Sequence, residues 1–212
     1  MSEPDKCPVN HADMKSFGAG CPVDHSKWKD HGGNGGEGLP PLPDVPQQLS
    51  AEREVSTIPR ADNKGNWVYP SEQQFFSAMK RKSHNPEARD MSVVIPIHNA
   101  VNERTWLGIL QWENGWGGDK CGGPKLVKFE GDASKWTPRA YMNYLLGNKP
   151  PFDRHDWVVD RCGKRIEYVI DYYAGAANPA NPYAASFYLD VRPKLNSLEG
   201  VKMRVCRFFG LA

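Results

Sequence analysis

A glycine-rich run followed by a proline-rich run limits where this chain can build a core. GGNGGEG spans residues 32–38, LPPLPDVP spans residues 39–46, and large apolar side chains are scarce in the first 50 positions. Such a segment buries too little apolar surface to offset the conformational entropy that it loses on ordering. We therefore expect residues 1–50 to form a flexible N-terminal arm and residues 51–212 to form one folded domain.

Capping residues predict two helices after the arm. Ser71 has the side chain of an N-cap, and a glutamine three residues later completes a capping box, so we expect a helix over about residues 71–82. Thr137 followed by Pro138 gives a second N-cap with proline in the first turn, and a Gly-Asn-Lys-Pro segment ends that helix.

Alternating apolar side chains predict two strands, over residues 165–173 and 186–192. A loop rich in alanine, asparagine and proline joins them, which favours an antiparallel pair. Together with the helices, these strands predict an α+β fold in which helices pack on a small antiparallel sheet.

The segment from Val93 to Glu113 carries a proline in an apolar run. Pro96 removes a backbone donor, so we expect residues 93–97 to be an extended edge segment. Asn99 or Asn102 would then cap a helix that reaches Glu113. The last apolar and basic stretch, residues 197–210, predicts a short helix that either lies on a membrane surface or packs on the core.

Composition excludes several functional classes. A net charge of +2 argues against a strongly cationic nucleic-acid binder, and five cysteines without a framework spacing argue against a disulfide scaffold. We find no run of 18 apolar residues, and the start MSEPDK lacks the features of a signal peptide or a cleavable mitochondrial presequence. Seven tryptophans and eight tyrosines suit either a core or a pocket for a large flat ligand.

A short motif occurs twice in the arm, as Cys-Pro-Val-Asn-His at 7–11 and Cys-Pro-Val-Asp-His at 21–25. Three hypotheses stay open for it. Cys7 and Cys21 can ligate haem iron as thiolates held outward by the following proline. The two cysteines and two histidines can instead hold zinc in a tetrahedral site, or the segment binds nothing.

Three histidines lie in the expected folded domain. His84 follows a basic stretch and should face solvent. His98 lies beside asparagines that can orient its second nitrogen, so a ligand role and a structural role remain open. His155 lies between two aspartates, which favours structural hydrogen bonds.

Several long motifs resemble those of the holocytochrome c-type synthases, or cytochrome c haem lyases. The matching segments are CPV (7–9 and 21–23), IPRAD (58–62), NWVYPSEQQFF (66–76), IHNAVNERTW (97–106), ILQWE (109–113), PFDRHDWVVDRCG (151–163), YVIDYYAG (168–175) and LDVRP (189–193). The resemblance covers about residues 55–210 in order.

The resemblance implies a lyase that joins b-type haem to apocytochrome c, and to apocytochrome c1 as a further candidate, by adding two cysteine thiols of a C-x-x-C-H segment to the haem vinyl groups. It implies that His98 ligates the haem iron and that Cys7 and Cys21 form peripheral haem regulatory motifs. Residues expected to line the haem or the cytochrome segment are Trp67, Tyr69, Asn99, Asn102 and Glu103. Arg161 should meet a haem propionate or pair with Asp156 or Asp160.

The resemblance also implies a place in the mitochondrial intermembrane space, peripheral on the inner membrane, with no nucleic-acid partner. An alternative hypothesis is a haem-sensing or haem-carrying module that uses the Cys-Pro motifs without catalysis.

Overall fold

The computed structural model describes residues 48–81, 85–132, 135–176 and 186–211, and within them it has an α+β architecture. This confirms the predicted fold class. The arm with Cys7 and Cys21, as well as His84, lies outside the described residues. The elements are β1 (Val55–Pro59), β2 (Asn66–Val68), α1 (Glu72–Arg81), the 3₁₀ turn η3 (Ala88–Asp90), α2 (Met91–Glu113), the 3₁₀ turn η4 (Gly118–Cys121), β3 (Lys125–Gly131), α3 (Pro138–Leu145), β4 (Asp153–Arg161), β5 (Lys164–Ala174), β6 (Phe187–Pro193) and α4 (Leu198–Phe208).

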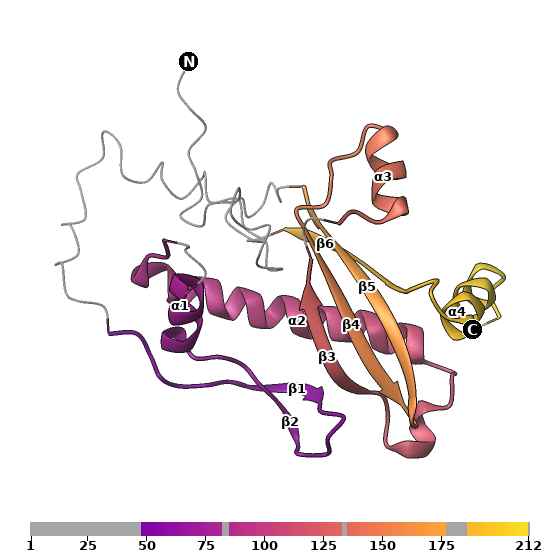
Figure 1. Cartoon of the computed structure of the whole chain (residues 1–212), viewed down its shortest axis with the longest axis horizontal. Coiled ribbons are helices and arrows are strands. Elements are labelled where there is room, and N and C mark those ends of the chain that lie inside the picture. The colour runs from indigo at the N-terminus through magenta and orange to yellow at the C-terminus, as the bar shows by residue number, and fades with distance from the viewer. Residues whose placement is uncertain (1–47, 82–84, 133–134, 177–185, 212) are drawn as a thin grey trace.

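A four-stranded antiparallel sheet, in the order β3-β4-β5-β6, forms the centre of the molecule. The long helix α2 runs across one face of this sheet, and the β1–β2 hairpin with α1 lies toward the N-terminal end of α2 (Figure 1). The core joins Trp106 and Ile109 of α2 to Trp157 of β4 and Ile170 of β5, all at most 3% exposed.

The two predicted helix starts are confirmed. In α1, the Ser71 amide donates to Gln74 Oε1 at 3.1 Å and the Gln74 amide donates to Ser71 Oγ at 3.3 Å, which is a reciprocal capping box. In α3, the Thr137 hydroxyl accepts from the Ala140 amide at 3.1 Å. Both caps are local, so they needed no knowledge of the tertiary structure.

The expectation for residues 93–97 is wrong, because they belong to α2 rather than to an extended segment. Asn99 and Asn102 lie inside this helix and cap nothing. Pro96 is the sixth helical residue, so its missing amide removes one intrahelical bond near the N-terminus, where the loss is easiest to tolerate. Packing of Met91 and Ile95 against Met79 of α1 offsets that loss.

Strands β3 and β4 were not predicted, whereas β5 and β6 are confirmed as an antiparallel pair. In β4 the buried face carries polar residues at both ends, Asp153 at 4% and Arg161 at 5% exposure, around Trp157 and Val159. Because of these buried polar residues, β4 does not show the alternation of apolar and polar side chains by which a strand is recognised in a sequence.

The C-terminal helix α4 packs on the core through a small part of its surface. Its buried contacts are Met203, which is fully buried, and Gly200, whose added Cβ would lie 1.9 Å from the Lys194 carbonyl oxygen. Several of its large apolar side chains face out, with Leu198 at 91% and Phe208 at 84% exposure.

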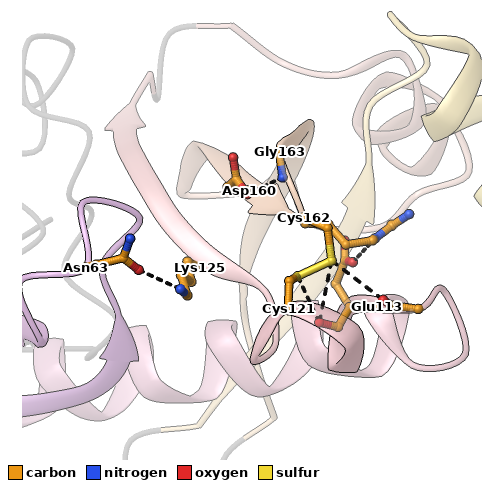
Figure 2. Close-up of a disulfide and its surroundings, with 10 residues drawn as sticks. Asn63, Glu113, Cys121, Lys125, Asp160, Cys162 and Gly163 are labelled. Carbon is orange, nitrogen blue, oxygen red and sulfur yellow. Dashed lines mark hydrogen bonds and ion pairs between the residues drawn. A yellow bond between two sulfur atoms is a disulfide. The ribbon is translucent and has the colours of Figure 1, made fainter.

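A disulfide joins Cys121 at the end of η4 to Cys162 in the β4–β5 turn (Figure 2). The two Cα atoms are 5.5 Å apart and the half-cystines are separated by 41 residues. The bridge therefore ties the segment after α2 to the sheet hairpin. Within the described ranges, Cys206 is a free cysteine.

Candidate functional site

The N-terminal half of α2 carries four of the predicted site residues in two neighbouring stripes. His98 and Asn102 are four residues apart, as are Asn99 and Glu103, so each pair shares a face of the helix. The first stripe continues to Thr105, which faces the sheet, and the second faces the β1–β2 hairpin.

His98 is partly buried, and its ring packs against Phe75 of α1 with ring centroids 5.1 Å apart. Burial lowers the pKa of His98 to about 4, because an imidazolium would lose its hydration there. At neutral pH the side chain is therefore an uncharged imidazole on a regular helix. That is the protonation state in which histidine ligates a metal.

His155 of β4 is the neighbour of His98 on the sheet side. Burial, and secondarily the electrostatic effect of His98, lowers its pKa to about 3. Its Nδ1 lies 3.4 Å from the Tyr172 hydroxyl, which in turn lies 3.3 Å from the Thr105 hydroxyl of α2. Its buried Nε2 lies 3.2 Å from Asp153 Oδ2 but without the geometry of a hydrogen bond. The structure thus brings two neutral imidazoles together between α2 and the sheet.

Glu103 anchors the β1–β2 hairpin to α2. Its carboxylate accepts hydrogen bonds from the Ser56 hydroxyl at 2.6 Å, the Tyr69 hydroxyl at 2.9 Å and both the amide and the hydroxyl of Thr57. Burial alone would raise the pKa of Glu103, but these donors outweigh it and hold the pKa below its usual range. Glu103 is therefore ionised at neutral pH.

The neighbours of Glu103 also take part in this hydrogen-bonded cluster. Burial, together with the nearby carboxylates, raises the pKa of Tyr69, so its hydroxyl stays protonated and donates. One turn back along α2, the Asn99 side-chain amide donates to Glu54 at 2.6 Å. Tyr69, Asn99 and Glu103, predicted as one site from separate motifs, do lie together.

Trp67 lies on the hairpin next to β3. Its ring meets Phe129 edge to face at 5.7 Å, and the Arg60 guanidinium lies over it at 5.1 Å. The indole Nε1 is buried, and within the described ranges it has no hydrogen-bond partner. The same holds for Nε1 of Trp157. A buried donor without an acceptor is rare in proteins and is a common property of ligand sites.

Arg161 does not lie with the other predicted site residues. It pairs with Glu113 at the C-terminal end of α2 and with Glu199 of α4 at 2.7 Å. Glu113 follows His98 by 15 residues, which is roughly 22 Å along a helix. Burial would lower the pKa of Arg161, but the bonded carboxylates raise it, so the group is a firmly charged member of a buried ion cluster.

The expected ion pair of Arg161 with Asp156 or Asp160 is wrong. Asp156 pairs with Arg154 at 3.0 Å and with Lys194 at 2.8 Å. Asp160 accepts from the Gly163 amide at 2.8 Å in the β4–β5 turn (Figure 2). Successive residues of a strand point to opposite faces, so the side chains of the neighbours Asp160 and Arg161 point away from each other.

Sequence reasoning missed Phe75, Thr105 and Tyr172 as surroundings of the two histidines. For Thr105 the available signal is its helical spacing, seven residues after His98. Tyr172 lies two residues from Ile170, the register partner of His155, and this register could not be predicted because β4 was not. In the part of the chain that the structure describes, no three His, Cys, Asp or Glu side chains are grouped to hold a metal ion. None of its helices is both long enough and apolar enough to cross a bilayer.

Comparison with known proteins gives consistent matches. The family described as "Cytochrome c/c1 heme lyase" matches residues 40–208. A putative holocytochrome-c1 synthase of Schizosaccharomyces pombe is 49% identical over 215 residues, covering 98% of this chain and 92% of the relative. The holocytochrome c-type synthases of Gallus gallus and Homo sapiens are 48% and 46% identical over 166 residues and 76% of this chain. The matched regions make up 60% and 61% of those two relatives. No solved structure matches the chain significantly.

Proposed function

This chain belongs to the cytochrome c/c1 haem lyase family, and we propose that it attaches b-type haem covalently to an apocytochrome of the c type. Relatives named as holocytochrome c-type synthases and as a c1 synthase support cytochrome c, and also cytochrome c1, as acceptors. In the reaction each acceptor thiol adds across one haem vinyl group. The thiol sulfur bonds to one vinyl carbon and the thiol proton is added to the other. The addition forms two thioethers in all and is redox-neutral.

The observation that supports this proposal most directly is the state of His98. An imidazole with a pKa of about 4 is neutral at physiological pH and keeps a lone pair for iron. A regular helix and the ring of Phe75 hold it in place. In our proposal His98 ligates the haem iron on one side, and the histidine of the acceptor C-x-x-C-H segment takes the other side.

Fixing the iron from both sides brings both acceptor thiols next to the vinyl groups. Such positioning replaces an encounter in solution by a reaction within one complex, and this can supply several kcal/mol of the rate enhancement. The thiols react as thiolates or near-thiolates. His155 is a second neutral imidazole near His98, with a pKa of about 3. We assign His155 to holding Tyr172 and the sheet, not to iron.

The Glu103 cluster and Trp67 would form the wall of the haem or acceptor site. The buried Trp67 indole N–H offers a donor that no described residue uses. Asn102 lies one helical turn after His98, where its amide can orient the imidazole. Asn99 and Tyr69 would hold the hairpin against α2 on this side. Arg161, far along α2, is assigned to the stability of the fold and not to a propionate.

For the arm we propose a secondary role. In this proposal Cys7 and Cys21 of the arm bind haem peripherally, and residues 51–212 are the lyase domain; Leu49 and Ser50, at the end of the arm, contact α1. A double Cys7→Ala, Cys21→Ala variant should then keep cytochrome maturation. If that variant lost maturation entirely, the arm would belong to the catalytic unit or to a haem-sensing module.

We propose that the protein acts in the mitochondrial intermembrane space, bound peripherally to the inner membrane. The exposed apolar side of α4 supports this, since Leu198, Val205 and Phe208 point outward beside the basic Lys202 and Arg207. An apolar side flanked by cations suits an anionic lipid surface. Alkaline carbonate should release the protein from membranes, and retention in the pellet would contradict a peripheral location.

The test of the proposed function compares two matched histidine variants. Each full-length protein is co-expressed with apocytochrome c or apocytochrome c1, and the pyridine haemochrome spectrum reports thioether formation. We expect His98→Ala to copurify with far less haem and form no thioether, with a melting temperature close to that of the wild type. We expect His155→Ala to lower the melting temperature and keep measurable activity. A His98→Ala protein that still matured cytochrome c would refute the assignment.

A further inference from the structure

A groove of about 590 Å³ follows the outer edge of β6, away from the two histidines. Its walls come from the outer side of α2, from α3 and from α4, and its floor is the edge strand itself. β6 is the last strand of the sheet, so one side of its backbone has no strand partner among the described residues.

The hydrogen bonds around β6 identify which backbone groups face the groove. The Lys194 amide bonds to Glu167 of β5, so even-numbered positions turn toward β5 and odd-numbered positions turn outward. The outward carbonyl of Val191 is capped by the Trp112 indole at 2.6 Å, and that of Pro193 by Arg204 at 2.7 Å. Within the described part, the N–H and C=O groups of Phe187 and Leu189 and the N–H of Val191 have no such partner.

A tight helix contact borders the groove on its α2 side. Gly108 brings α2 against β6 so closely that an added Cβ would lie 2.9 Å from Val191 Cγ2. The groove runs along residues 187–191 of β6. A free row of donors and acceptors is a template for another extended chain.

The charges along the groove are mostly positive. Arg104 of α2, Arg139 of α3 and Arg207 of α4 line it, with Asp190 as the single carboxylate, so the lining sums to three positive minus one negative, or +2. Asp190 is already paired with Arg139 at 3.1 Å and with the buried Arg192 at 2.7 Å. Arg104 is exposed and forms no ion pair within the described ranges.

We propose that this edge binds an extended peptide strand with acidic side chains from a partner protein, by strand addition to β6. Only a peptide backbone supplies alternating donors and acceptors at the strand spacing, which lipid head groups do not. Carboxylates on the peptide would meet Arg104 on one face of the sheet and Arg139 on the other. A second copy of this chain is a poor occupant, because pairing two β6 edges would bring two grooves of +2 together.

The test uses the full chain and a labelled decapeptide in which pairs of glutamates alternate with pairs of threonines, so that carboxylates lie on both faces of the added strand. We expect binding that weakens as salt is added, and slower exchange of the outward amides of Phe187, Leu189 and Val191 when the peptide is present. The lysine analogue of the peptide, and a glutamate peptide methylated at its backbone amides, should each bind at least tenfold more weakly. Equal binding of the methylated peptide would overturn strand addition.

Three protein variants complete the test. Leu189→Pro removes an outward N–H without breaking a bond to β5. Arg104→Glu reverses the charge of an arginine that forms no ion pair within the described ranges. Each substitution should weaken binding at least tenfold. Arg165→Glu, an exposed arginine near the β4–β5 turn, is the matched control and should bind as the wild type does. The proposal fails if the free monomer already protects the outward amides of Phe187, Leu189 and Val191, if lipid vesicles alone protect them, or if Leu189→Pro instead dissociates a dimer of this chain.

Discussion

The paired histidines predict a specific loss of stability in mild acid. In the unfolded chain both imidazoles have a pKa of about 6.5, whereas in the fold His98 has a pKa of about 4 and His155 of about 3. Between those values the unfolded state binds more protons than the native state. The free energy of unfolding therefore falls as the pH is lowered from 7 to 5.

The magnitude follows from the pKa differences. At pH 5 each unfolded imidazole is almost fully protonated and each native one is almost fully neutral, which corresponds to about 2 kcal/mol per histidine. The two together give a loss of about 4 kcal/mol, a large share of the 5–15 kcal/mol by which domains are typically stable.

Guanidinium unfolding at pH 7 and at pH 5 measures this loss. The reference is a double variant, His98→Asn with His155→Asn, in which the amides keep part of the polar contacts but do not titrate. Carboxylates such as Glu103 titrate in both proteins, so their contribution cancels in the difference between them. We expect the wild type to lose about 4 kcal/mol more than the reference between pH 7 and pH 5. An equal loss in the two proteins would refute the buried, neutral state of the pair.

Three further variants test how the rest of the fold is held together. Replacing Cys121 and Cys162 by serine should destabilise the domain by about 4 kcal/mol, since the bridge closes a loop of 41 residues; denaturant unfolding with and without reductant measures this. Gly108→Ala should cost about 1–3 kcal/mol in a thermal melt by forcing α2 away from β6, and an unchanged melt would contradict the tight contact. Arg161→Met should cost about 3–5 kcal/mol by leaving the Glu113 carboxylate buried without its cation, and a stable variant would show that the cluster is dispensable.

Local signals in the sequence were sufficient for part of the fold. The capping box at Ser71 and the N-cap at Thr137 act within four residues, and the strands around Ile170 and Val191 carry alternating apolar side chains, although residues 168–172 of β5 are buried on both faces. The start of α2 could not be predicted in this way, since a proline rule valid for strands competed with tertiary packing. What decides that segment is the contact of Ile95 with α1, which no local pattern contains.

In the candidate site, too, some neighbours follow from local sequence spacing and others depend on the tertiary structure. Asn99 and Glu103 share a helix face, so sequence spacing alone places them together once the helix is known. The approach of His155 to His98 depends on how β4 registers in the sheet, and β4 itself was hidden by its buried polar ends. The partners of Arg161 could not be predicted either, because Glu113 and Glu199 come from two helices far away in sequence.

The two ends of α2 therefore serve different purposes, and this determines how variants should be interpreted. Near its N-terminal end, His98 is neutral and packed on one ring, so replacing it should remove the proposed haem ligand at small cost to the fold. Near its C-terminal end, Glu113 lies in a buried cluster with Arg161 and Tyr168, and the adjacent disulfide fixes that end to the sheet hairpin. A rigid C-terminal end sets where the N-terminal half of the helix lies over the sheet. A change there should lower activity by shifting or unfolding the helix, and under the proposed ligation by His98 the spectrum of any haem still bound should not change.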